Sequence, residues 1–516
     1  MEQRGVFWPM AFEAHVAECR VIGEIPRDIF GGFYRNGPTQ KYPARQGNET
    51  VFTTDGMVQG LILQDGKASF RNRWVRTPKF CAEERARQAL FEWVDCNAND
   101  WTAFGLGDII RNRFTEGLSH STAMVNAFPF GDNLYAVGEQ SGAPLALDPL
   151  TLETKGYPVW ADRLSAGIRE PVAFGDGNMA PHPKWDSETG VLYAWGYRDE
   201  PPYVTLHWIK PDGSMQSRPL DEAPYGTVAH DAWLTEHYFI LPFQPFTISR
   251  ERANKGIGGY GWETELPIML AVLDRHNIDA PVRWITADLE PQYMMHMLSA
   301  NEIGDKIALD APVFQRPPFQ TIDMSQPGDP FIPFFQVSPS KLGRWTIDLS
   351  NETVRSEILD DVMCELPKID ERFFGKPYQW GHIIGGHESG SRAGAMRMDT
   401  LIRRDMRTGT DQRQKVSDNK HHAVLEPAFI PRTPDSPEGD GYLIVPVSKF
   451  AEHLGEYQLF DTADITAGPI ATIELPFHMG WTPHGHWMDF RTVDSISNSV
   501  LRLPASVPEY GPWISA

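Results

Sequence analysis

The chain has 516 residues, 41% of them hydrophobic and 22% charged, which is the balance of an ordinary globular protein. Its formal net charge of −21 argues against a basic nucleic-acid-binding face, so we expect no nucleic-acid partner. No stretch approaches the roughly 18 consecutive apolar residues of a transmembrane helix. The four cysteines show no CxxC spacing and the N-terminus does not resemble a signal peptide, so we expect a cytoplasmic protein.

Most of the chain follows a strand–turn–strand pattern. Residues 1–30 are predicted to form an N-terminal arm that starts helically between residues 11 and 26. From about residue 50, short apolar runs alternate with turns rich in Gly, Asp and Asn. The pair Asp65-Gly66 separates two strand-like runs and predicts a hairpin. The same pattern recurs as far as residue 476 and predicts an all-β protein.

The units recur at a loose spacing of roughly 40–70 residues, which favours a β-propeller over an array of β-sandwiches. No linker divides the chain, so we predict one domain over residues 1–516. Two insertions interrupt the strand pattern, at 79–130 and 313–340. The first begins with a helical pattern over 79–93 and the second is rich in Pro and Phe. We expect both to cover one face of the propeller, where loops shape a substrate site.

A histidine between two prolines marks the first candidate functional position. Pro183 fixes its own φ and biases His182 toward extended backbone. Turn residues then lead into the apolar run 191–195. A single histidine in such a setting is more often structural than functional. The argument for function therefore depends on whether the setting recurs.

Three further histidines stand at the edges of predicted strand pairs, each in a different unit. The set is His182, His230, His296 and His484. Because the innermost strands of a propeller converge on its axis, these side chains can meet although they are far apart in the sequence. Four neutral imidazoles form a site for a divalent first-row metal, and iron, copper, zinc and nickel all suit such ligands.

Metal-binding histidines commonly donate their second ring nitrogen to a carboxylate. Three glutamates have suitable settings. Glu139 ends a strand, whereas Glu365 and Glu426 stand in apolar company close before a proline, where an unpaired carboxylate is costly. The alternative for each is an ordinary surface or turn position.

Several motifs together resemble the carotenoid cleavage oxygenase family over nearly the whole chain. They are YRNGP at 34–38, FTTDGM at 52–57, GKASFRNRWVRT at 66–77, HPKxDxxTG at 182–190, HDxxLTE at 230–236 and the Glu-Pro pair at 426–427. The resemblance implies a seven-bladed propeller with an Fe(2+) ion on its axis. It also implies cleavage of a conjugated C=C bond by O2 into two carbonyl products.

By motif, the four histidines match the family's iron ligands, and Glu139, Glu365 and Glu426 match the glutamates that orient them. The family has a Gly after its last ligand. We therefore assign His484, which precedes Gly485, in preference to His478 or His486.

Within the family, the segments 79–91, 333–349 and 484–489 resemble the bacterial and fungal branch that cleaves lignostilbenes and phenylpropenoids. The stilbene cleavers of that branch carry a Lys where this chain has Gly138, and a Tyr in the segment where it has Trp93. We therefore expect a phenylpropenoid or stilbene-like aryl-alkene other than lignostilbene itself. The predicted aromatic pocket consists of Trp93, Phe314, Phe319, Phe331, Phe334, Phe335 and Trp481, for which core packing is the alternative.

Other functions stay open on the sequence alone. The substrate of a cleaving enzyme could instead be a carotenoid or apocarotenoid. The axial metal could be structural in a non-catalytic binding module. A metal-dependent hydrolase is a third alternative, and the shortage of paired carboxylates near the histidines argues against it.

Overall fold

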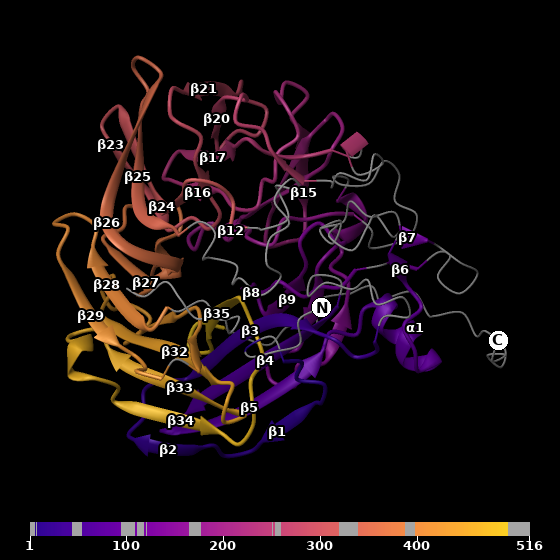
Figure 1. Cartoon of the computed structure of the whole chain (residues 1–516), viewed down its shortest axis with the longest axis vertical. Coiled ribbons are helices and arrows are strands. Elements are labelled where there is room, and N and C mark those ends of the chain that lie inside the picture. Colours follow the sequence, from indigo (N-terminus) through magenta and orange to yellow (C-terminus); the bar gives the residue numbers. More distant parts are fainter. Residues whose placement is uncertain are drawn as a thin grey trace.

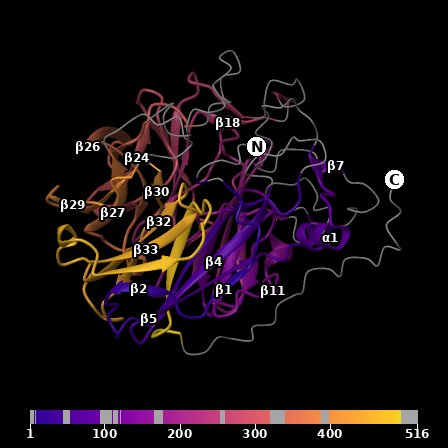
Figure 2. The same ribbon diagram turned by 60° about the horizontal axis from the view of Figure 1, so that its bottom comes forward.

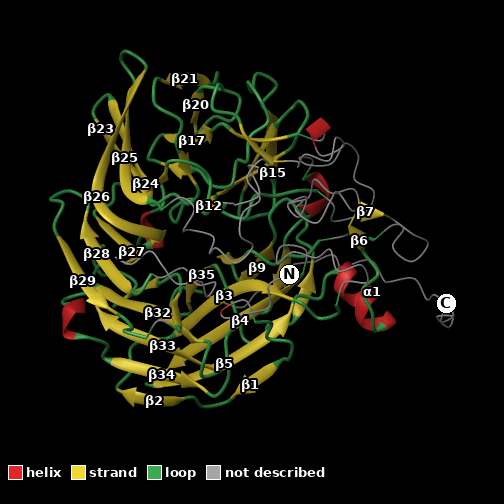
Figure 3. Cartoon of the chain, in the orientation of Figure 1, coloured by secondary structure: helices red, strands yellow, loops and turns green. Residues whose placement is uncertain are grey.

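The structure is a computed structural model. It describes residues 6, 8–43, 54–93, 109–110, 118–119, 121–164, 177–249, 251–252, 260–318, 339–386, 398–419 and 421–493. In this part of the chain nearly all regular structure is strand (Figure 3). The helical elements are α1 (Pro78–Ala86) and the 3-10 turns η4 (Ala161–Arg163), η6 (Glu371–Phe373) and η7 (Ile465–Ala467).

The strands form antiparallel sheets arranged around a centre, as expected for a propeller (Figure 1). One sheet has the order β1-β5-β4-β3-β35, with β1 (Ala14–Val16), β3 (Gly31–Thr39), β4 (Asp55–Gln64), β5 (Lys67–Trp74) and β35 (His484–Asp489). The next contains β8 (Asn126–Phe130), β9 (Asn133–Val137), β10 (Leu145–Leu147) and β11 (Thr154–Gly156).

The following sheets repeat this four-stranded form. One contains β12 (Lys184–Trp185), β13 (Leu192–Tyr197), β14 (Val204–Ile209) and β15 (Met215–Pro219). Another contains β16 (Trp233–Leu234), β17 (Tyr238–Phe243), β20 (Ile268–Asp274) and β21 (Arg283–Ala287). Two small pairs stand apart, β18 (Phe246–Ile248) with β19 (Tyr260–Trp262), and β6 (Glu92–Trp93) with β7 (Ile109–Ile110).

Two larger sheets complete the described part. The eight-stranded one contains β22 (Tyr293–Met294), β23 (Ser299–Ile303), β24 (Lys306–Phe314), β25 (Lys341–Asp348), β26 (Thr353–Lys368), β27 (Trp380–Gly386), β28 (Thr400–Asp405) and β29 (Asp411–Lys415). The other contains β2 (Arg20–Gly23), β30 (His422–Val424), β31 (Ala428–Pro431), β32 (Gly441–Lys449), β33 (Leu454–Asp461) and β34 (Ala471–Leu475).

The long strand β26 changes partner along its length. Its first half pairs with β25, and its second half, from Met363 to Lys368, pairs with β27. Such a strand can belong to two neighbouring blades. The number of blades, seven, stays a prediction.

The two ends of the described chain are joined in one sheet. Residues 31–36 of β3 pair antiparallel with residues 484–489 of β35. In addition, β2 pairs with β34 (Figure 1). These pairings connect the N-terminal and C-terminal parts of the ring, so the last predicted ligand, His484, starts a strand held by the first sheet.

The N-terminal arm is where local prediction was wrong. Residues 11–26 contain no helix but two strands, β1 and β2, which add to the edges of two different sheets. The hairpin at Asp65-Gly66 is confirmed. Both residues have positive φ (50° and 77°), which a two-residue turn between twisted strands requires.

The helix predicted over 79–93 is shorter than expected. Thr77 caps its first turn by accepting the Phe80 N–H, and Pro78 occupies the first turn without loss of a hydrogen bond. The helix ends at Arg87, which has a left-handed conformation. In both views α1 lies outside the sheets (Figures 1 and 2). Much of the two predicted insertions, 79–130 and 313–340, lies outside the described residues.

Buried apolar side chains pack between neighbouring sheets rather than at one central core. The largest clusters join adjacent sheets, for example Trp195 and Leu206 of one sheet with Phe239 and Leu241 of the next. In the described part of the chain, no helix is long and apolar enough to cross a bilayer. The compartment stays a prediction.

Candidate metal centre

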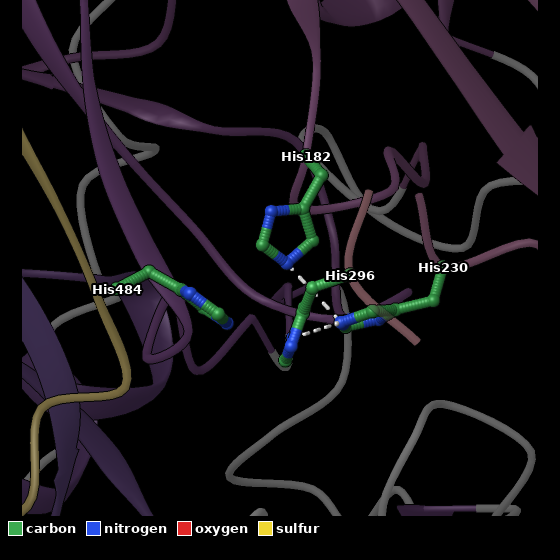
Figure 4. Close-up of side chains that lie close together, drawn as sticks. All are labelled: His182, His230, His296 and His484. Carbon is green, nitrogen blue, oxygen red and sulfur yellow. Dashed lines mark hydrogen bonds between the residues drawn. The ribbon is translucent and has the colours of Figure 1, made fainter. Parts of the chain in front are cut away.

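The four predicted histidines come together in one cluster (Figure 4). His182 and His230 stand just before the edge strands β12 and β16, His296 follows the edge strand β22, and His484 starts the edge strand β35. Each ligand candidate thus leaves the inner edge of a different sheet. The prediction that these four histidines would lie close together in the fold is confirmed.

The four side chains are buried and point toward one another. Their candidate ligand atoms all lie within 4.8 Å of each other. The Nε2 atom of His230 is 3.1 Å from that of His182 and 3.2 Å from that of His296. The ring of His484 packs edge-on against that of His182, with centroids 4.3 Å apart.

Each of the three predicted glutamates contacts one of the histidines through Nδ1. Glu365 Oε2 lies 2.8 Å from Nδ1 of His296. Glu426 Oε1 lies 3.0 Å from Nδ1 of His484, and Glu139 Oε2 accepts from Nδ1 of His230. The Nδ1 atoms therefore face carboxylates, and the Nε2 atoms face the centre.

The histidines of the centre differ in their affinity for protons. Burial lowers the pKa of His484 to about 3, although Glu426 acts against it. Burial and the three neighbouring imidazoles hold the pKa of His182 well below its ordinary value. At His296 burial lowers the pKa, but Glu365 outweighs it and the net shift is upward. Neutral His182 and His484 are in the form that binds metals.

The arrangement fits a bound cation. His230 and His296 direct Nδ1 to carboxylates, and their Nε2 atoms face each other at 3.2 Å. A proton, which the raised pKa of His296 favours, or a metal ion between the two nitrogens removes the repulsion between their lone pairs. Four imidazole nitrogens without a thiolate suit divalent first-row metals. The four buried histidines can therefore hold a metal ion.

A buried ion pair next to the histidines was not predicted. Lys184 Nζ lies 2.6 Å from Oδ1 of Asp231, and the other carboxylate oxygen of Asp231 accepts the N–H of Met297 at 2.7 Å. Asp231 directly follows His230 in the sequence. Lys184 and Asp231 belong to the motifs at 182–190 and 230–236, but these motifs do not show that the two side chains meet.

Two further partners of the glutamates were also missed. The hydroxyl of Tyr197 donates to Glu139, and Nζ of Lys368 lies 3.5 Å from Oε2 of Glu426. Burial raises the pKa of Glu426, but Lys368 and His484 outweigh burial and hold it well below the ordinary value. Glu426 is therefore an ionised carboxylate at neutral pH.

The predicted aromatic pocket is only partly described. Phe314 is fully buried in a cluster with Tyr293, with ring centroids 6.3 Å apart. Trp481 is half-buried against the cluster that contains Phe33. The side chain of Trp93 and the residues Phe319, Phe331, Phe334 and Phe335 lie outside the described residues.

Gly138, at the position where we expect a Lys in stilbene cleavers, packs closely against Ser141. A Cβ atom at Gly138 would lie 2.0 Å from Oγ of Ser141, which is itself hydrogen-bonded to Thr122 at 3.1 Å. A side chain at this position would therefore require Ser141 to turn away and give up that hydrogen bond.

Comparison with known proteins identifies the family. The model of the RPE65 (retinal pigment epithelial membrane protein) family matches residues 7–489. The chain belongs to this family, that of the carotenoid cleavage oxygenases. It is 30% identical over 500 residues to isoeugenol monooxygenase of Pseudomonas nitroreducens, covering 94% of this chain and 97% of that protein. It is also 30% identical to lignostilbene-alpha,beta-dioxygenase isozyme III of Sphingomonas paucimobilis, covering 94% and 96%.

A solved structure of this family supports the fold. The structure of the lignostilbene dioxygenase of Pseudomonas brassicacearum matches this chain with a TM-score of 0.81 and 28% sequence identity. The match covers 95% of this chain and 98% of that one. The Synechocystis apocarotenoid oxygenase has a TM-score of 0.75 at 23% identity, which supports the fold alone. The predicted propeller architecture is thereby confirmed.

Proposed function

We propose that the chain is a non-haem Fe(2+)-dependent oxygenase that cleaves a conjugated C=C bond of a small apolar aryl-alkene with O2 into two aldehyde or ketone products. The observation that carries the proposal is the buried cluster of four histidines, three of them bonded to glutamates. Relatives at 30% identity are named for isoeugenol and lignostilbene, which are phenolic aryl-alkenes.

The proposed ligands and their orienting residues are those of the sequence prediction. The ligands are His182, His230, His296 and His484, and the orienting carboxylates are Glu139, Glu365 and Glu426. Iron is favoured over zinc because a reaction with O2 needs a redox-active metal. When bound, Fe(2+) supplies the redox chemistry by which O2 reacts with an alkene.

The overall reaction needs little from the protein in acid–base chemistry. The alkene R–CH=CH–R′ and O2 give R–CHO and R′–CHO, so each oxygen atom ends in one product and no proton or external electron is consumed. The residues near the centre accordingly orient ligands. Glu365 and its two counterparts keep protons on Nδ1, which leaves Nε2 free for the metal. Burial of the cluster keeps bulk water from the reacting atoms.

We also propose that residues 1–516 form one propeller domain, covered on one face by the insertions 79–130 and 313–340, and that it works in the cytoplasm. The pairing of β3 with β35 supports the single domain, because it joins the two ends of the described chain in one sheet. The scarcity and spacing of cysteines support the compartment.

The test is product analysis of the iron-loaded protein. It is incubated with isoeugenol, 4-vinylguaiacol, resveratrol and a C30 apocarotenal, in air and without O2. We expect an aryl-alkene to give its aldehydes only with both iron and O2. Cleavage of the apocarotenal alone would assign the alternative substrate class, and cleavage of none would contradict the proposed reaction for these substrates. The His296→Ala variant, prepared in the same way, is the control for adventitious iron.

A further inference from the structure

A small cavity adjoins the histidine cluster. It has a volume of about 30 Å³, and its lining includes His182, His296, Asn126, Lys368 and His486. A cavity of this size has room for a single water-sized molecule, provided that polar partners face it.

Two buried hydrogen-bond acceptors in this lining lack a partner. His486 directs Nδ1 to a carboxylate oxygen of Glu371 at 2.6 Å, so the proton is on Nδ1 and Nε2 is a bare acceptor. Asn126 donates its Nδ2 to the carbonyl of Pro181 at 2.8 Å, which leaves Oδ1 as an acceptor. Both atoms are buried without a hydrogen bond among the described residues. Leaving either unsatisfied costs about 1–3 kcal/mol.

Lys368, in the lining of the cavity, has one ammonium proton without an assigned acceptor. Nζ of Lys368 lies 3.0 Å from Glu371 and 3.5 Å from Glu426, and an ammonium group has three protons. It is also 3.5 Å from Nδ1 of His486, but that atom already carries the proton given to Glu371. The third ammonium proton is therefore available to a molecule in the cavity.

We propose that this cavity binds one water molecule, which donates to Asn126 Oδ1 and His486 Nε2 and accepts from Lys368 Nζ. Two acceptors and one cationic donor require a molecule that donates twice and accepts once. O2 and small anions donate no proton, and an ammonium ion is repelled by Lys368. The site therefore selects water and does not favour O2. The proposal is independent of which metal the histidines hold.

A larger hollow shares residues with the surroundings of the small cavity. It has a volume of about 850 Å³ and is lined by Glu371 and Trp185, and Glu371 also bonds His486 of the small cavity. The ring of Trp185 packs against that of His486, with centroids 5.5 Å apart. Glu371 and Trp185 therefore connect the lining of the hollow with His486.

The direct test is a crystal structure of the metal-loaded protein at a resolution that orders internal water. We expect one solvent peak within about 3.2 Å of Asn126 Oδ1, His486 Nε2 and Lys368 Nζ. An empty cavity, or an asparagine turned so that Nδ2 faces the cavity, would overturn the proposal. The wild-type protein alone gives this answer.

A second measurement counts the water in solution. Oxygen-17 magnetic relaxation dispersion measures the number of long-lived internal waters, and we expect His486→Phe to lose one relative to wild type. His478→Phe is the matched control. His478 is 7% exposed and His486 5%, but both ring nitrogens of His478 have protein partners, Ser448 and the Trp8 carbonyl. Equal counts in wild type and His486→Phe would contradict the proposal.

Discussion

Asp231 and Lys184 form a buried ion pair, with Oδ1 and Nζ 2.6 Å apart, beside the histidine cluster. The second oxygen of Asp231 accepts the N–H of Met297. Asp231 and Met297 each directly follow a histidine of the cluster, and Lys184 lies two residues after another. A single carboxylate thus ties together three of the four segments that carry the proposed ligands.

The first prediction concerns this carboxylate. Asp231→Asn should weaken metal binding by about 10- to 100-fold, the usual range for residues that position ligands. The reason is that Lys184 loses its counter-charge and the three segments lose a common anchor. Anaerobic titration with Fe(2+) measures the change in the dissociation constant.

A second buried ion pair, whose side-chain contacts in the described part of the chain include none of the four histidines, separates this effect from a loss of stability. Asp310 is fully buried and holds Arg344 at 2.7 Å. Asp310→Asn should lower the free energy of unfolding yet leave the Fe(2+) dissociation constant unchanged. If both variants bind iron as the wild type does, Asp231 has no positioning role.

The second prediction concerns the carboxylate behind His296. Glu365→Ala should weaken Fe(2+) binding by about 10- to 100-fold, because Nδ1 of His296 loses the acceptor 2.8 Å away. Glu365→Gln should weaken Fe(2+) binding less, since an amide oxygen can still accept the hydrogen bond from Nδ1 of His296. The same titration tests both variants, and an alanine variant that binds like wild type would contradict the assigned role.

The third prediction is a pH dependence of stability at His382. This side chain is stacked on Phe429, and neither ring nitrogen has a partner among the described residues. Burial and Arg403 lower its pKa to about 3. Between pH 6.5 and 3 the proton therefore binds to the unfolded chain in preference to the folded one, and stability falls as the pH falls.

His382→Phe removes this proton-binding site and keeps the stacking. From pH 6 to pH 5, the wild type should lose about 1 kcal/mol more free energy of unfolding than the variant does. Urea unfolding at the two pH values measures the difference. An equal loss of unfolding free energy in both proteins would show that His382 does not contribute to the pH dependence of stability.

The fourth prediction concerns the anchor of helix α1. Lys79 is buried and holds Asp55 at 2.9 Å and Glu83 at 2.8 Å. Lys79→Met leaves two carboxylates buried without a cation, which should cost about 3–5 kcal/mol of the free energy of unfolding. Lys341→Met, which breaks an exposed pair with Asp361, should cost no more than about 1 kcal/mol. Equal costs in the two variants would contradict the account.

Local patterns predicted the features that depend on neighbours in the sequence. The hairpin at Asp65-Gly66 follows from the need for positive φ in a tight turn. The histidine cluster was predictable because each member stands next to or in an edge strand of a different sheet. Glu139, Glu365 and Glu426 were found mainly through the resemblance to a family.

Features that depend on distant segments were not predictable in this way. Residues 11–26 form strands because β5 and β34 offer free edges to them, which no local preference reveals. The pair Lys184–Asp231 joins residues 47 positions apart, the difference of the two numbers. Each lies in a motif, but neither motif reveals that the two side chains meet. The early end of α1 depends on the left-handed conformation of Arg87.

The most direct test of the central claim is the iron content of the protein after anaerobic loading with Fe(2+) and removal of excess metal. The account predicts one iron per chain in the wild type and almost none in His484→Ala. His478→Ala, which changes a nearby histidine outside the cluster, should keep one iron. A wild type without bound iron, or His484→Ala that retains it, would contradict the four-histidine iron centre.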